Sequence, residues 1–101
     1  MEQIPIDRIW DKENKYPNGL VRSYSHWTIE VSYRQHTLGS YILFCHRPVE
    51  QIAELDAAEM LELRHMMGAA QGAIQKAFSP DRFNYLQLGN SLNHLHIHGI
   101  P

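Results

Sequence analysis

The chain lacks the features that would place it in a membrane or outside the cell. It has no apolar run near the ~20 residues that a membrane-spanning helix needs, and residues 1–7 lack the basic and apolar regions of a signal peptide. A single cysteine, Cys45, excludes an internal disulfide and fits a reducing compartment. The formal net charge of -2 gives no electrostatic footprint for nucleic acid or anionic membranes. We therefore expect a cytoplasmic protein with neither nucleic acid nor membrane as its partner.

The composition is that of an ordinary globular protein. Of the 101 residues, 44% are hydrophobic and 20% are charged, which suffices for one hydrophobic core. We expect a single domain over residues 1–101, in which residues 1–18 form a polar N-terminal extension. The chain ends directly after a histidine-rich tract.

Period-two patterns predict strands on both sides of one long helical segment. Apolar and polar residues alternate from Trp27 to Tyr33, as in a half-buried strand. A continuous apolar run follows between Gly39 and Pro48, which is typical of a strand buried on both faces. The expected strands cover residues 20–24, 27–33, 41–45, 83–88 and 92–100.

A helix is expected between the third and fourth strands. Asp56 is a good N-cap residue with Glu59 three positions later as its capping-box partner, and Ser79-Pro80 would end the helix. The order of elements predicts an α+β fold, with an antiparallel sheet of about five strands and one long helix packed on it. The expected apolar stripe of the helix is Met60, Leu63, Met67, Ala70, Ile74 and Ala77.

Three histidines alternate near the end of the chain, at His94, His96 and His98. Residues i, i+2 and i+4 of a strand share one face, so all three imidazoles would project together. Leu95 and Ile97 would then face the core. Imidazole titrates near neutral pH, ligates metals and can act as a nucleophile, so we expect the chemistry of the protein here.

The residues alone leave three interpretations of this tract. The histidines could be structural or surface residues. They could bind zinc, with a further ligand such as His36, His46 or Glu30, because three histidines in line on a strand are too far apart for a compact site. One imidazole could instead attack a phosphorus atom, which needs its second ring nitrogen held as a donor, usually by a carbonyl.

The stretch from Gly89 to Pro101 resembles the signature of the histidine triad (HIT) superfamily, His-φ-His-φ-His-φ-φ with φ apolar. Thr37–Cys45 is similar to the family's segment leading into its central strand, and His46–Leu55 is similar to its strand-to-helix connection. The likeness covers nearly the whole chain after residue 20. The Asn-x4-Gly-Asn spacing that begins at Asn84 most resembles the bacterial branch of dinucleoside-polyphosphate-hydrolase-like members.

The resemblance implies a role for each histidine. His96 would be the nucleophile that forms a nucleotidyl-histidine intermediate. His98 would hydrogen-bond the phosphoryl group or the leaving atom, and His94 would position the nucleophile. The substrate contacts implied by the resemblance are Asn84, Asn90 and Ser91 at the α-phosphate and Ser32 at the ribose hydroxyls.

Three departures from the family pattern bear on these roles. Ser40 stands where many members have a fourth histidine, and Ser32 stands where an acidic or amide residue often binds the ribose. The sequence ends at Pro101, whereas members usually continue with an arginine and a tail. A lost orienting group at position 40 could reduce activity.

The resemblance implies an enzyme that cleaves at the α-phosphate of nucleoside phosphoramidates or dinucleoside polyphosphates through a covalent intermediate. It further implies a nucleotide substrate, a homodimer and no required cofactor, although magnesium could accompany a polyphosphate substrate. Two alternatives remain at this point. One is a zinc-dependent hydrolase that uses the same histidines, and the other is a nucleotide-binding or adaptor protein with weak activity.

Overall fold

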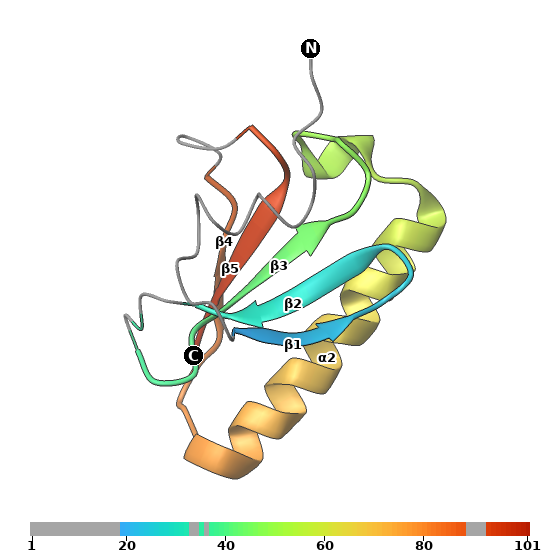
Figure 1. Cartoon of the computed structure of the whole chain (residues 1–101). Helices are drawn as coiled ribbons and strands as arrows, with labels where there is room; N and C mark the ends of the chain where they lie inside the picture. Colours follow the sequence, from blue (N-terminus) through green and yellow to red (C-terminus); the bar gives the residue numbers. More distant parts are fainter. Residues whose placement is uncertain (1–18, 33–34, 36, 89–92) are drawn as a thin grey trace.

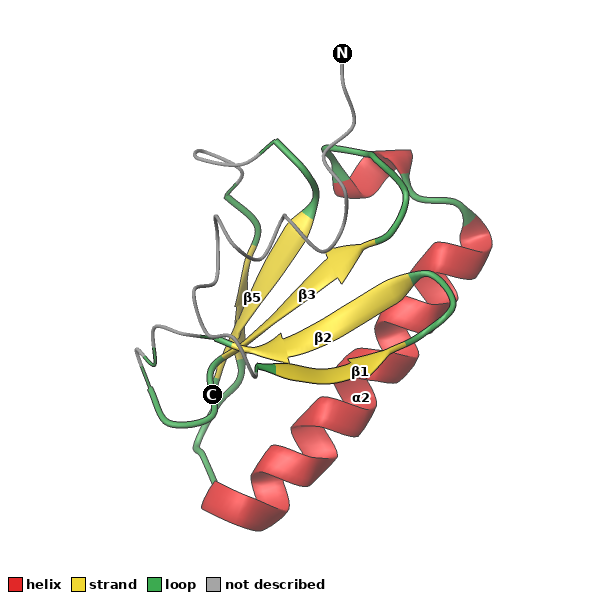
Figure 2. Ribbon diagram, in the orientation of Figure 1, coloured by secondary structure: helices red, strands yellow, loops and turns green. Residues whose placement is uncertain are grey.

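In the computed structural model the described residues are 19–32, 35, 37–88 and 93–101. Within them, a single sheet has the strand order β1-β2-β3-β5-β4, and every neighbouring pair is antiparallel (Figure 1). The helix α2 lies against one face of this sheet (Figure 2), which confirms the predicted α+β class. The elements in chain order are β1 (Leu20–Ser23), β2 (Trp27–Val31), β3 (Tyr41–Cys45), the short 3-10 helix η1 (Ile52–Glu54), α2 (Ala57–Phe78), β4 (Asn84–Leu86) and β5 (His96–Ile100).

The strand register divides the side chains of the sheet between two faces. Thr28 lies opposite Phe44, which in turn lies opposite His96. Directly opposite residues on antiparallel strands point to the same face, so this row lies on one side of the sheet. We call this side the histidine face, and its next row is Glu30, Ile42 and His98.

The opposite side, the helix face, carries the hydrophobic core under α2. Trp27 and Leu43 are fully buried there, and the Trp27 Nε1–H donates to the carbonyl of Glu59 on α2 over 2.9 Å. Burial of side chains of this size contributes about 1.5–3 kcal/mol each. The core consists of Trp27, Ile29, Tyr41, Leu43, Cys45, Val49, Leu63, Met66, Leu95 and Ile97.

Helix α2 begins and ends where the sequence predicts. The Asp56 carboxylate accepts from the Glu59 N–H over 2.8 Å, and the Glu59 carboxylate accepts from the Asp56 N–H over 2.9 Å, which completes the capping box. Ser79 ends the helix in the left-handed region, with φ 48°. No helix in the described part of the chain combines the length and the apolar character needed to cross a membrane.

The predicted apolar stripe of α2 was wrong at both ends of the helix, where Met60 and Ala77 are exposed. Met60 is 44% exposed, whereas Glu59, Leu63 and Met66 are the buried residues of α2. Glu59 turns inward because Arg47 donates to both of its carboxylate oxygens, over 2.8 and 3.0 Å. These bonds hold the pKa of Glu59 at about 2, well below its ordinary 4.5. An ion pair therefore replaces a hydrophobic residue at the first inward position.

Four strands are shorter than predicted, and η1 was not predicted. β1 ends at Ser23 and β2 ends at Val31, one and two residues earlier than expected. β4 has three residues instead of six, and β5 begins at His96 instead of Leu92. The ladder between β3 and β5 stops because the Leu95 N–H donates to the carbonyl of Val49, beyond the end of β3, over 2.8 Å. Residues 89–92, where the predicted last strand would begin, lie outside the described residues.

Gly99 is required by its neighbour on β3. A Cβ atom at this position would lie 2.3 Å from Cζ of Tyr41, whose ring occupies the space on the helix face. The Tyr41 hydroxyl is 2.8 Å from that of Tyr85 on β4, to which Gln71 of α2 also donates over 2.7 Å. The Tyr41 ring therefore contacts both β5, at Gly99, and β4, at Tyr85. The Tyr85 hydroxyl completes the link to α2 through Gln71.

Candidate active site

His96 and His98 come together on the histidine face. They are two residues apart on β5, and their ring centroids are 5.2 Å apart with an interplanar angle of 77°. His96 is only 3% exposed. The prediction that these two imidazoles share one face of a strand is therefore confirmed, as is the prediction that Leu95 and Ile97 face the core.

The orientation of the His96 ring is fixed by the backbone. Its Nδ1 lies 2.7 Å from the carbonyl oxygen of His94. A carbonyl can only accept, so Nδ1 carries the proton in this arrangement and the lone pair of the neutral ring lies on Nε2. This is the tautomer that attack by Nε2 on an electrophile requires.

His94 lies outside β5, so the prediction that all three histidines stand on one strand was wrong in that part. It precedes β5, and its Nε2–H donates to the carbonyl of Cys45 at the end of β3. Burial lowers the pKa of His94, only partly opposed by this hydrogen bond, so the ring is neutral at pH 7. The backbone carbonyl of His94 contacts the ring of His96, and His96 in turn helps to disfavour the charged form of the His94 ring.

Of the four residues predicted to contact the substrate, Asn84 and Ser32 lie within the described part of the chain. Asn84 is exposed on β4, opposite Ile100 and two residues from Leu86, which lies opposite His98. Ser32 is buried just beyond β2, where its N–H donates to the carbonyl of Ser40 over 2.9 Å. Both therefore lie toward the His98 end of the histidine face. Asn90 and Ser91 lie outside the described residues.

Ser40, at the position of the family's fourth histidine, has a structural role. It is 2% exposed, and its hydroxyl donates to the carbonyl of Thr37 over 2.7 Å and accepts from the Thr37 N–H over 3.3 Å. Gln35 adds a bond from its side-chain amide to the carbonyl of Ser40 over 2.7 Å. These bonds satisfy backbone groups of Thr37 and Ser40 just before β3.

His46, which the sequence offered as a possible further zinc ligand, is a polar residue of this face with another set of contacts. It follows β3 and has the same parity as Ile42 and Phe44, which is the signal that could have placed it here. Its Nε2 lies 2.7 Å from Oγ1 of Thr28, and its Nδ1 lies 3.2 Å from the carbonyl oxygen of Ser25. His46 is close enough to His94 to disfavour the charged form of that ring.

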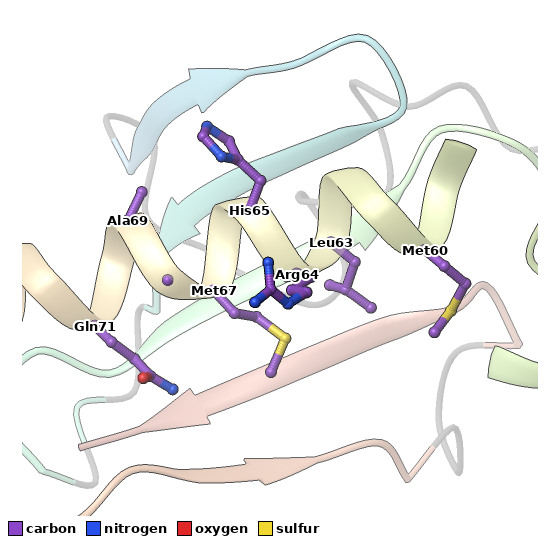
Figure 3. A pocket seen from close by; sticks show the side chains of 8 residues that line it. Met60, Leu63, Arg64, His65, Met67, Ala69 and Gln71 are labelled. Carbon is purple, nitrogen blue, oxygen red and sulfur yellow. The ribbon is translucent and has the colours of Figure 1, made fainter. Parts of the chain in front are cut away.

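The described residues contain no group of three or more His, Cys, Asp or Glu side chains that could hold a metal ion. A hollow of about 600 Å³ lies along α2, away from the histidine face (Figure 3). Met60, Leu63 and Met67 point from the helix toward the side of β5 and β4 there (Figure 3). This hollow is mostly apolar and carries none of the triad.

A family model for the HIT domain matches residues 28–101. The match covers most of the chain and includes the three histidines and the strands that hold them. The chain therefore belongs to the HIT domain family.

Solved structures of HIT proteins share the fold. A HIT family protein from Bacillus subtilis has 23% identity and a TM-score of 0.77, covering 99% of this chain and 73% of its own. One from Bacillus anthracis has 23% identity and a TM-score of 0.73, covering 82% of this chain and 62% of its own. A diadenosine triphosphate hydrolase from Plasmodium falciparum has 17% identity and a TM-score of 0.74, covering 84% of this chain and 61% of its own. This chain thus spans less than two thirds of the last two proteins, and a search of curated proteins found no match.

Proposed function

We propose that this HIT-domain protein is a nucleotide hydrolase or nucleotidyl transferase that cleaves at an α-phosphate through a covalent intermediate on His96. The observation that carries the proposal is the bond from Nδ1 of His96 to the carbonyl of His94, because it leaves the lone pair on Nε2. The ring of His98 lies alongside, 5.2 Å from that of His96. Family membership and the fold shared with a diadenosine triphosphate hydrolase support the substrate class.

The reaction would proceed in two displacements at phosphorus. Nε2 of His96 attacks the α-phosphorus, forming an N–P bond while the P–O or P–N bond to the leaving group breaks. The leaving atom takes that electron pair and a proton from protonated His98. Water then attacks the same phosphorus, the N–P electron pair returns to Nε2, and a proton from the water passes to His98. The product is a nucleoside monophosphate, and the enzyme regains its starting protonation state.

The remaining assignments belong to the same proposal. Asn84, Asn90 and Ser91 would contact the α-phosphate and Ser32 the ribose, as the family resemblance implies. We expect dinucleoside polyphosphates or nucleoside phosphoramidates as substrates, as in the bacterial dinucleoside-polyphosphate-hydrolase-like branch. The reaction would need no resident cofactor, and magnesium would enter with a polyphosphate substrate.

We further propose a cytoplasmic homodimer with no nucleic acid or membrane partner. The short strand β4 is an edge of the described sheet, and its Leu86 is 43% exposed. The hollow with Met60 and Met67 lies beside β4 on α2 (Figure 3). An unpaired strand edge next to exposed apolar side chains supports pairing with a second copy.

The test is nucleotide release by metal-stripped protein. Adenosine phosphoramidate and a diadenosine polyphosphate are each incubated with wild type, His96→Ala and the control His65→Ala, and AMP is measured by HPLC. His65 is exposed on α2, so its replacement controls for the loss of an imidazole. Release by wild type and the control, but not by His96→Ala, is the expected result.

Other outcomes would support the alternatives. Activity that appears only after zinc is added would favour a zinc hydrolase. Nucleotide binding without release under any condition would favour a binding protein. Trapping a phosphorus adduct on wild type, and rescue of His96→Gly by added imidazole, would establish covalent catalysis directly.

A further inference from the structure

The bond that fixes the His96 ring comes from a peptide group that is itself held on its other side. The carbonyl of His94, which accepts from Nδ1 of His96 over 2.7 Å, belongs to the same planar unit as the N–H of Leu95. This N–H donates to the carbonyl of Val49 over 2.8 Å. Because the peptide is trans, its N–H and its carbonyl point in opposite directions. The His96 ring and the Val49 carbonyl therefore hold one rigid unit from opposite sides, and a shift of either tilts it.

Cys45, the last residue of β3, adds two more bonds to the same segment. Its N–H donates to the carbonyl of Leu95 over 3.3 Å, and its carbonyl accepts from Nε2 of His94. Leu95 and Val49 are both buried, so water does not compete for these bonds. Figure 1 shows the connection that follows β3 beside the start of β5. Residues 45–49 therefore orient the two residues that precede β5.

The position of the Val49 carbonyl is set by a tight turn. The Val49 N–H donates to the carbonyl of Arg47 over 2.8 Å, which closes a three-residue turn with Pro48 at its centre. The ring of Pro48 fixes the φ angle that such a turn needs. Val49 therefore keeps its position only where Arg47 keeps its own.

Arg47 is anchored to η1 and α2 by its guanidinium group. Nε and Nη2 donate to the two carboxylate oxygens of Glu59 over 3.0 and 2.8 Å, and Nη2 also donates to the carbonyl of Glu54 over 2.7 Å. Glu59 is buried at the start of α2, and its carboxylate also accepts from the Asp56 N–H. The side chain of Arg47 is 47% exposed, so its loss opens no cavity in the core. What its loss removes is the attachment of the turn at Pro48 to the helix.

We infer that Arg47 is a positioning residue for the proposed nucleophile. It holds the turn against α2, and the Val49 carbonyl then keeps the peptide of His94 in the orientation that bonds to Nδ1 of His96. This inference rests on the proposed function, because it takes His96 to be the nucleophile. Arg47 acts through the backbone rather than on the substrate. Without it, the neutral His96 ring divides between its two tautomers, and only the form protonated on Nδ1 can attack through Nε2.

The decisive quantity is the tautomer of His96, measured by ¹⁵N NMR of the imidazoles at about pH 8, where a histidine of ordinary pKa is neutral. His96→Ala identifies the signals of this ring. Wild type should carry the proton on Nδ1, whereas Arg47→Gln should show a mixture of both tautomers. With adenosine phosphoramidate as substrate, kcat of Arg47→Gln should fall roughly 10-fold and KM should change by less than about twofold, because only the reactive fraction of the ring falls.

Two milder variants grade the effect. Arg47→Lys keeps the charge, but one ammonium group cannot hold both Glu59 oxygens in the same geometry, so its tautomer ratio and kcat should lie between those of wild type and Arg47→Gln. Pro48→Ala frees the φ angle at the centre of the turn. Because Pro48 is exposed, this change removes little packing, and it should shift the tautomer in the same direction as Arg47→Gln.

Two controls separate positioning from charge and from stability. Arg64→Gln removes an exposed arginine of α2 and should leave both the tautomer and kcat unchanged. Ile29→Val removes a methyl group from the core on the helix face of β2 and destabilises the protein without touching the turn. It should also leave the His96 tautomer unchanged.

A His96 tautomer that stays the same in both Arg47→Gln and Pro48→Ala would overturn the inference. An equal shift in Ile29→Val would also overturn it, because the cause would then be a general loss of stability. If Arg47→Gln fails to fold, Arg47→Lys and Pro48→Ala decide. Failure of the proposed function has a different sign, namely wild-type turnover that His96→Ala retains, and the tautomer measurement does not depend on turnover.

Discussion

The two faces of the sheet are built from the same strands but have opposite chemistry. On β5, Ile97 points into a core of aromatic and aliphatic side chains under α2, whereas His96 and His98 point to the other side. β3 is buried on both faces, with Leu43 under the helix and Phe44 on the histidine face. Adjacent residues of one strand can therefore serve stability and the proposed catalysis separately, because strand side chains alternate.

Substitutions at neighbouring positions of β5 test this separation, because one should affect stability and the other activity. Ile97→Ala should lower the free energy of unfolding by about 2–4 kcal/mol, because it leaves a cavity in the core. His98→Ala should change it by less than about 1 kcal/mol and should lower kcat about 10²- to 10⁴-fold through loss of the proposed proton donor. Urea unfolding and AMP release on both variants measure the two effects. Equal effects of the two substitutions on both quantities would contradict the division of the faces.

Gly99 tests how tightly the helix face is packed. Gly99→Ala should destabilise the protein by about 1–3 kcal/mol, because the new methyl group would overlap the rigid ring of Tyr41. Gly68→Ala on α2 is the matched control, since a Cβ atom there meets nothing within 4 Å. That control should stabilise the protein by about 0.5–1 kcal/mol. The penalty at Gly99 should shrink in a Tyr41→Leu background, and a penalty that persists there would assign it to the backbone instead.

The ion pair between Arg47 and Glu59 makes the helix face sensitive to acid. The pKa of Glu59 falls from 4.5 to about 2 on folding, chiefly through hydrogen bonds from Arg47. Its contribution to stability is therefore complete above pH 4.5 and is lost as the pH falls toward 2. Because the side chain of Arg47 is 47% exposed, solvent screening limits the loss to about 1–2 kcal/mol. Unfolding of wild type and Glu59→Gln between pH 2 and 5 measures it, and parallel curves would contradict this role.

The smallest effect is expected at His94. His94→Ala removes the bond to the Cys45 carbonyl but keeps the backbone carbonyl that holds Nδ1 of His96. We expect kcat to fall about 10-fold, far less than for His96→Ala, because the tautomer of the proposed nucleophile survives. Single-turnover AMP release compares the two variants. A loss as large as that of His96→Ala would mean that the imidazole of His94 contacts the substrate.

Local patterns predicted most of the fold. The capping box at Asp56, the stop at Ser79 and the buried strand at 41–45 each depend on neighbours within a few residues, so the sequence contains the whole signal. The facing of His96 and His98 followed from strand alternation in the same way. The HIT signature further predicted the family that the domain match confirms.

Tertiary contacts determined what local patterns could not. Leu95 bonds to Val49 instead of extending β5, so His94 leaves the strand. Glu59 takes an inward helix position because Arg47, twelve residues earlier, neutralises it. His46 bonds to Thr28 on another strand. None of these partners is adjacent in sequence, and each changes the position or role of one side chain.

Cys45 gives the chain a practical property for biophysical work. Its thiol is fully buried, and burial raises its pKa to about 11, so the reactive thiolate is scarce at neutral pH. It is also the one cysteine of the sequence. A cysteine introduced at an exposed position such as Leu61 of α2 would therefore take a fluorophore or spin label selectively, with the native thiol left in place.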